Sequence, residues 1–240
     1  MTNDSEEKPA TATNATWATA ILIAGLLGWL GYSFPPKTWR IPDSMANIGP
    51  LSPPAEQAKL AAKEYENLWK NTLLKFGLAG AGIGLVGIFV NRGSNWGSTI
   101  VTLLCGAVAG LAAGSLGLML RRHLDLDHPL PLISAEMRPL VADSAVFALV
   151  SVLLLVPVAV FIAMRPDKSE RHKAAPSILA GVLTGLLVPV SGAFLFPEAN
   201  LSRYPLDQLV VTAFWFAALA LFTVLLFVFS SPKKPKTQVV

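Results

Sequence analysis

The chain has 240 residues, of which 53% are hydrophobic and 14% are charged, with a formal net charge of +4. A soluble globular domain carries about 25% charged residues, and too little polar chain remains here to cover the apolar runs as buried core helices. The composition therefore excludes an ordinary soluble domain and predicts an all-α polytopic membrane protein. The basic residues flank the apolar runs, which indicates topology signals and excludes a nucleic-acid footprint.

Long runs without Asp, Glu, Lys or Arg predict the membrane-spanning helices. A bilayer core of about 30 Å needs about 20 apolar residues in a helix, and all but the second of the predicted spans lie in runs of that length. The second run is short, but Leu73, Leu74 and a snorkelling Lys75 extend it. We expect a membrane domain over 17–230, with spans at about 17–34, 73–91, 98–120, 144–164, 175–196 and 208–230.

The first apolar run follows an N-tail over 1–16 that is net acidic and is expected to be disordered. A secretory signal peptide has positive charge before its apolar segment and a small-residue cleavage site after it. Neither pattern is present, so the run is interpreted as an uncleaved first span. Its aromatic residues, Trp17 near one end and Trp29, Tyr32 and Phe34 near the other, match the aromatic belts of a membrane–water interface.

The longest segment between spans runs from Pro35 to about Thr72, and its first part is rich in proline, which forbids a continuous helix there. Its second part, about 53–72, predicts an amphipathic helix because apolar residues recur at intervals of three and four. We expect this helix to lie on the membrane surface or to run on into the second span. A docking face for a partner is the alternative. The stripe consists of Ala61, Tyr65, Leu68, Trp69, Thr72 and Phe76.

Small residues recur along one face of three predicted spans. In lipid, such faces let helix backbones approach closely, so they predict packing surfaces of the glycine-zipper kind in preference to a ligand groove or a dimer seam. The short connection over 92–97 predicts that the second and third spans form an antiparallel hairpin. The predicted packing residues are Gly77, Gly80, Gly84 and Gly87, then Gly106, Gly110 and Gly117, and finally Gly181 and Gly185.

The fourth and sixth spans carry bulky side chains instead, which are typical of helices that face lipid. The sixth holds Phe214, Trp215, Phe216, Phe222, Phe227 and Phe229.

The sequence "LLVPV" occurs in both the fourth and fifth spans, where Pro157 and Pro189 each remove a helix hydrogen bond and predict a kink. Neighbouring hydroxyl groups, those of Ser151, Thr184 and Ser191, are candidates to satisfy the freed carbonyls.

The segment "HLDLDH" contains the one candidate metal site, formed by His123, Asp125, Asp127 and His128. Imidazole and carboxylate groups ligate divalent cations, but four ligands within six residues do not easily surround one ion. The alternative is that the aspartates pair with Arg121 and Arg122. No metal or cofactor is expected. A disulfide within the chain is excluded because Cys105 is the single cysteine.

No ionisable side chain lies deep in a predicted span, and the motifs of serine hydrolases, zinc proteases and nucleotide-binding loops are missing. We therefore expect no enzyme. The leading hypothesis is a non-enzymatic structural or accessory subunit, partnered by the lipid bilayer and by other membrane subunits or further copies of itself. The alternative is a permease or channel for a neutral or amphipathic solute, with its path near Pro157, Pro189 and the glycine faces.

The positive-inside rule gives the expected orientation. Basic clusters at 165–173 and in the basic, disordered C-tail over 231–240 favour both termini in the cytoplasm. Basic residues on the other side, including Lys37, Arg40 and Arg121, argue against it.

Overall fold

The structure is a computed structural model that describes residues 13–35, 37–91, 96–126, 137–165, 168–198 and 204–230. All regular elements in these ranges are helical. The long helices are α1 (Asn14–Ser33), α2 (Pro54–Gly84), α4 (Trp96–Leu126), α5 (Arg138–Ala163), α6 (Ala174–Leu195) and α7 (Leu209–Phe229). The short ones are η1 (Asp43–Met45), α3 (Val86–Asn91) and η2 (Lys168–Lys173).

In the described ranges, six helices are long and apolar enough to cross a membrane, and they match the six predicted spans in order. This confirms the predicted all-α class. The first helix begins at Asn14, inside the predicted N-tail, because Thr13 caps it by accepting a hydrogen bond from the amide of Thr16. Most of that tail and the whole C-tail, residues 1–12 and 231–240, lie outside the described residues.

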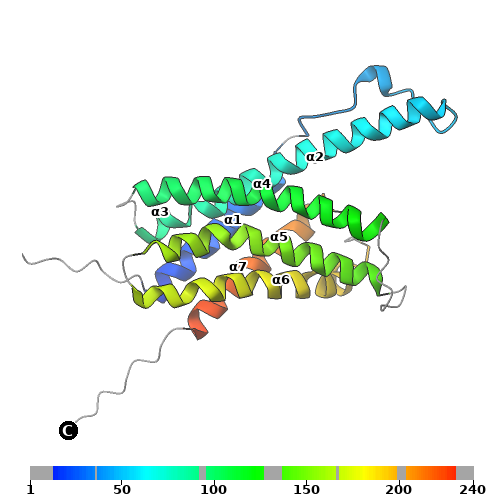
Figure 1. Cartoon of the computed structure of the whole chain (residues 1–240). Helices are drawn as coiled ribbons and strands as arrows, with labels where there is room; N and C mark the ends of the chain where they lie inside the picture. Colours follow the sequence, from blue (N-terminus) through cyan, green and yellow to red (C-terminus); the bar gives the residue numbers. More distant parts are fainter. Residues whose placement is uncertain are drawn as a thin grey trace, which may run out of the picture.

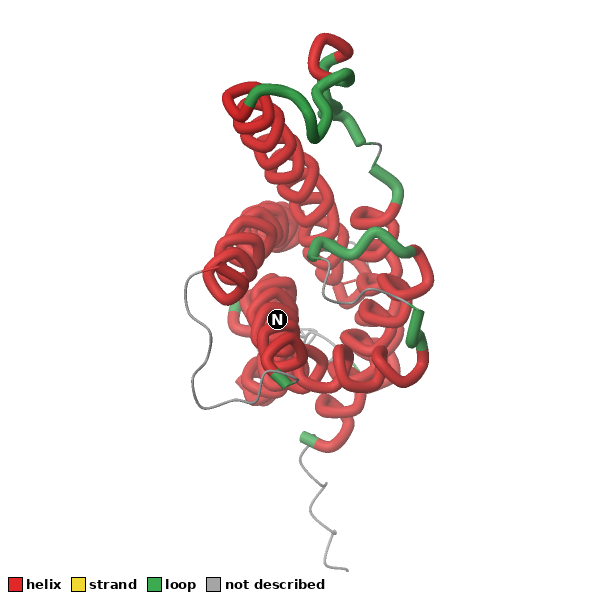
Figure 2. The backbone as a smooth tube through the Cα atoms, turned by 90° about the vertical axis from the view of Figure 1, so that its right-hand side faces the viewer, coloured by secondary structure: helices red, strands yellow, loops and turns green. Residues whose placement is uncertain are grey.

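The six long helices form a ring that closes in chain order. Each packs against the next, from α1 to α2, α4, α5, α6 and α7, and α7 packs back against α1. Figure 1 shows them running side by side, and Figure 2 shows the bundle along the helices. The rings of Trp17 and Phe227 are 5.6 Å apart, which places the start of α1 beside the end of α7. We call this the termini end and the opposite end the arm end.

The arm is residues 54–72, the first part of α2, which projects past the bundle at the arm end (Figure 1). Pro53 and Pro54 start the helix, where a missing amide donor costs nothing, and no break separates the arm from the part packed in the ring. The predicted amphipathic helix therefore runs on into the second span, which was one of its two expected courses. The predicted second span ends in α3, after a turn at Leu85 whose amide bonds to the carbonyls of Gly82 and Ile83.

Aromatic side chains fill the axis of the ring at the level of the arm end. The Trp215 ring lies 5.1 Å from that of Phe147 and 6.1 Å from that of Phe76, both edge to face. Trp215 also donates a hydrogen bond of 2.9 Å to Ser151 Oγ. Further along the axis, a cavity of about 10 Å³ between α1, α2, α5 and α7 has an apolar wall, so the axis stays closed to water there.

Two expectations about aromatic residues are wrong for only part of the residues named, since Phe229 is 80% exposed and Phe34 is 65% exposed, as expected. Trp215, Phe216 and Phe227 of the sixth span are buried and do not face lipid, and α5 is buried along one whole side. Trp17 and Tyr32 of α1 are also buried inside the ring and form no belt on its surface. The reason is that lipid-facing and core-facing positions are both apolar, so composition alone does not separate them.

Backbones approach closely at two helix pairs. A Cβ atom added at Gly80 would overlap the carbonyl oxygen of Gly106, and one added at Gly110 would overlap that of Phe76. These pairings run in opposite directions along α2 and α4, so the predicted antiparallel hairpin is confirmed. Between α6 and α5, a Cβ at Gly181 would lie 2.8 Å from the Cα of Val152.

Pro157 and Pro189 lie inside α5 and α6, and both are buried. The hydroxyl groups expected to satisfy their freed carbonyls bond elsewhere. Ser151 binds Trp215, while Thr184 donates to the carbonyl of Ala180 at 2.7 Å, one turn earlier in its own helix.

Candidate functional site

The arm-end cavity, with a volume of about 660 Å³, is a feature of the described residues that could receive a ligand. It forms where the segment after α1, the arm and the segment before α7 meet. Its wall mixes apolar and charged side chains, and a volume of this size is typical of a small-ligand site. The lining residues are Lys37, Trp39, Arg40, Ile41, Glu64, Asn67, Leu68, Asn71, Thr72, Lys75, Pro205 and Asp207.

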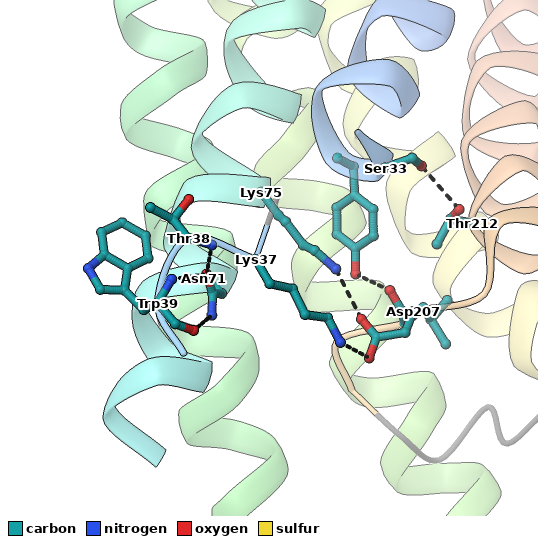
Figure 3. A network of polar contacts seen from close by, with 10 residues as sticks. Ser33, Lys37, Thr38, Trp39, Asn71, Lys75, Asp207 and Thr212 are labelled. Atoms are coloured by element: carbon teal, nitrogen blue, oxygen red, sulfur yellow. Dashed lines mark hydrogen bonds and ion pairs between the residues drawn. The ribbon is translucent and has the colours of Figure 1, made fainter. Parts of the chain in front are cut away.

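Asn71 of α2 fixes one wall of the cavity. Its Oδ1 accepts hydrogen bonds from the backbone amides of Thr38 at 3.1 Å and Trp39 at 3.3 Å. Its Nδ2 donates to the carbonyl of Trp39 at 2.9 Å. Figure 3 shows this single amide holding the extended segment against the helix. A proline-rich segment that cannot form its own helix thus gets its backbone partners from a side chain.

Asp207 fixes the opposite wall by holding two cations. Lys75 Nζ donates to its Oδ1 at 3.0 Å, and Lys37 Nζ lies 3.9 Å from its Oδ2 (Figure 3). Lys75 is only 13% exposed and also lies 5.4 Å from the ring centre of Tyr32. The hydroxyl of Tyr32 donates to the Leu206 carbonyl at 3.0 Å, which ties the segment before α7 to α1.

Two further lining residues carry buried polar atoms without a hydrogen-bond partner among the described residues. They are Asn67, through Nδ2, and Thr72, through Oγ1. Asn67 is 6% exposed and Thr72 is fully buried. An unsatisfied buried polar group costs about 1–3 kcal/mol, and both atoms are closed off from the cavity as well as from solvent.

Two charged lining residues remain after these contacts. Arg40 donates from Nε to the Lys37 carbonyl at 3.4 Å, and both Arg40 and Glu64 are exposed. In the described part of the chain neither has an ion pair. Among the described residues, the wall therefore presents one cation and one anion without an ion pair, together with the Lys37–Asp207–Lys75 group, which keeps one net positive charge.

Next to the cavity, the arm carries its own charge pairs. Glu66 binds Lys63 at 2.8 Å and also binds Lys70, and these hydrogen bonds lower the pKa of its carboxyl group to about 2. The pairs follow the i,i+3 and i,i+4 spacing that supports an exposed helix.

The predicted site residues lie elsewhere. Neither the two prolines nor any of the nine predicted glycines lines the cavity. Gly80, Gly84, Gly106 and Gly110 meet in the contact between α2 and α4. The remaining glycines contact side chains or the backbone of α5: Gly77 lies against Leu111, Gly87 against Phe161, Gly117 against Tyr204, and Gly181 and Gly185 against α5.

The predicted metal ligands fall mostly outside the described residues. Asp127 and His128 lie in the gap over 127–136, and the Asp125 side chain also lies outside the described part of the structure. His123 lies in the last turn of α4, and the described residues hold no group of three or more His, Cys, Asp or Glu able to bind a metal.

The expected pairing of Arg121 and Arg122 with Asp125 and Asp127 involves side chains outside the described ones, so it stays a prediction. Both arginines have other contacts. Arg121 forms an ion pair with Asp143 of α5, and Arg122 lies 5.0 Å from the ring centre of Tyr65. Asp143 is buried because α5 begins at Arg138, six residues before the predicted span. It lies near the arm end and not deep in the bundle.

The cavity was not among the predicted sites, although α2 carries a sequence signal for it. Glu64, Asn67, Asn71 and Lys75 recur at intervals of three and four, which places polar groups on one face of the helix. The other walls come from residues 37–41 and 205–207, which are far from this helix face in the sequence, so the signal alone does not define the site.

The fold defines a class, an all-helical chain whose six apolar helices indicate a multi-pass membrane protein. No protein-family model, curated protein or solved structure matches the chain, so the class is not narrowed to a family.

Proposed function

We propose that the chain is a non-enzymatic multi-pass membrane protein that serves as a structural or accessory subunit. The observation that carries this proposal is the filled axis of the ring, where Trp215 packs against Phe147 and Phe76. A conduit needs continuous space along its axis, whereas a scaffold needs packed helices. The closed ring therefore favours a protein that works through its surfaces.

The glycine faces have a role in the same proposal. Because Gly80 and Gly106 leave no room for a side chain between α2 and α4, they act as packing residues that hold the scaffold together. Pro157 and Pro189, both buried in the contact side of their helices, shape α5 and α6 as kinks.

The arm is the proposed contact with another membrane subunit. It is largely exposed, and Leu51 in the turn that precedes it is fully exposed to solvent. Since α2 is one helix from the arm into the ring, a subunit bound to the arm is coupled directly to the membrane domain. We place the termini end, with Arg165 and Lys173, in the cytoplasm.

The test is gentle extraction from native membranes on a C-terminal tag, followed by mass spectrometry of the intact complex. The expected result is a second subunit in fixed stoichiometry. A photo-crosslinking residue at Leu51 should form an adduct with that subunit. A matched one at Leu104, which is 57% exposed on the lipid-facing side of α4, should form none.

A chain that is recovered alone or only as a homo-oligomer, with no adduct from Leu51, would contradict the accessory function.

The arm-end cavity favours a second candidate, a permease for a neutral or amphipathic solute, because it offers an entry of about 660 Å³ beside the ring. This candidate predicts that Pro189→Ala changes solute flux into liposomes while the protein stays folded. Unchanged flux in this variant would remove it.

A further inference from the structure

We propose that the arm-end cavity binds the head group of a zwitterionic phospholipid that carries a free ammonium group, with its phosphate toward Arg40 and its ammonium toward Glu64. This inference concerns a ligand site and does not depend on whether the arm also binds another subunit.

The position of the cavity selects a lipid. Its walls follow directly after the end of α1 at Ser33 and directly precede the start of α7 at Leu209. This is the level at which apolar spans give way to polar chain. Trp39 and Ile41 are partly exposed on the wall among basic residues, a combination that is typical of the head-group region of a bilayer. Phospholipid head groups are the most abundant polar ligands at that level.

The charges of the wall select the head group. Lys37 and Lys75 share Asp207, so only one of their two positive charges is compensated, and the other remains to attract a phosphate. Arg40 and Glu64 are left without an ion pair among the described residues. A phosphodiester accepts hydrogen bonds from a guanidinium in a two-pronged arrangement, and a primary ammonium donates to a carboxylate. A purely anionic head group would leave Glu64 facing like charge, and a quaternary ammonium has no N–H to donate.

The test is lipid add-back to the delipidated full-length protein in detergent, measured by native mass spectrometry. Phosphatidylethanolamine, phosphatidylcholine and phosphatidylglycerol with the same acyl chains are compared. The expected result is one bound phosphatidylethanolamine at concentrations about tenfold below those needed for either of the others, the difference that one charge-assisted hydrogen bond supplies.

Two variants locate the lipid. Arg40→Gln and Glu64→Gln should each weaken phosphatidylethanolamine binding about tenfold, and Glu64→Gln should abolish the preference over phosphatidylcholine. Both residues are exposed, so neither change removes a core contact. The matched controls are Lys59→Gln and Glu56→Gln, two exposed arm residues that do not line the cavity. They should leave binding unchanged.

Three results would overturn the proposal. Equal binding of phosphatidylglycerol would define an anionic site in which Glu64 has no part. Binding that is unaffected by both cavity variants would place the lipid elsewhere on the protein. Water-soluble phosphoethanolamine that binds as tightly as the whole lipid would identify a free zwitterion as the ligand.

Discussion

The two parts of α2 are stable for different reasons. The part within the ring is rich in glycine, which is a poor helix former, and it is held by backbone contacts with α4, as at Gly80. The arm consists largely of Ala, Glu, Lys, Gln and Leu, which are good helix formers, and it is reinforced by pairs such as Glu66–Lys70. The first part depends on its neighbours, and the second depends on its own sequence.

This difference predicts that destabilising substitutions in the two parts of α2 affect different amounts of the structure. A change in the ring part should affect the whole bundle, because the contacts that stabilise it are shared with other helices. A change in the arm should remain local, even when its cost is similar.

The largest effect is expected for Gly80→Leu. The new side chain would overlap the backbone of Gly106, which cannot move without separating α2 from α4. We expect a loss of about 3 kcal/mol or more, enough to reduce the yield of folded protein sharply. Urea unfolding in detergent measures it. Gly49→Leu is the control, because no atom lies within 4 Å of a Cβ at that position. Wild-type stability of Gly80→Leu would show that the close approach does not hold the ring.

The next effect is expected for Ala61→Pro in the arm. Proline in a helix interior costs about 3 kcal/mol, but Ala61 is exposed and contributes no core contact. Hydrogen–deuterium exchange should become faster over 54–60, while the urea midpoint of the bundle stays unchanged. Ala61→Gln should leave both unchanged. A fall in the bundle midpoint would mean that the arm and the ring unfold together.

A smaller effect is expected at the junction of the two parts. Asn71→Leu removes three hydrogen bonds to residues 38 and 39, with a local cost of about 1–2 kcal/mol because water replaces part of them. Faster amide exchange at Thr38 and Trp39 is the readout. In lipid-free detergent the matched variant Asn67→Leu should be neutral, since its Nδ2 has no partner to lose among the described residues. Equal effects of both variants would contradict the assigned role of Asn71.

The smallest effect is expected for the exposed pairs of Glu66. Its pKa is lowered to about 2 by Lys63 and Lys70, so the pairs stabilise the arm fully above pH 4.5 and lose their contribution as the pH falls through about 2. Glu66→Gln should therefore speed exchange in the arm slightly at pH 7 and leave it unchanged near pH 2. An equal effect at both pH values would contradict the ion pairs.

The sequence was sufficient to locate the helices. It was not sufficient to tell which side of each helix is buried in the bundle and which side is exposed. Runs without charge identify spans reliably because an uncompensated charge in lipid is costly. The same rule misplaced the start of α5, since Asp143 is tolerated there through its pair with Arg121. The buried positions of Trp17 and Trp215 could not be predicted, because a residue that is apolar in lipid is equally apolar in the core.

The arm-end cavity shows why the candidate site was harder to predict than the fold. One wall follows from the spacing of Asn67, Asn71 and Lys75 along a helix, which is local information. The other walls depend on Asp207 reaching Lys75, more than a hundred residues away in the chain. The contact between Asp207 and Lys75 forms only when the ring of helices closes. No pattern within a single segment of the sequence predicts it.

The closed ring also imposes an order on biosynthesis. A chain is made from its amino end, so α1 is synthesised five long helices before α7, the partner that completes the ring. Trp17 is covered by Phe161 of α5 and Phe227 of α7. Until those helices arrive, this tryptophan and the rest of the inner face of α1 have to be sheltered by lipid or by the insertion machinery. A chain that is truncated before α7 therefore leaves the α7-facing side of α1 uncovered. This exposed surface distinguishes the truncated chain from the complete protein.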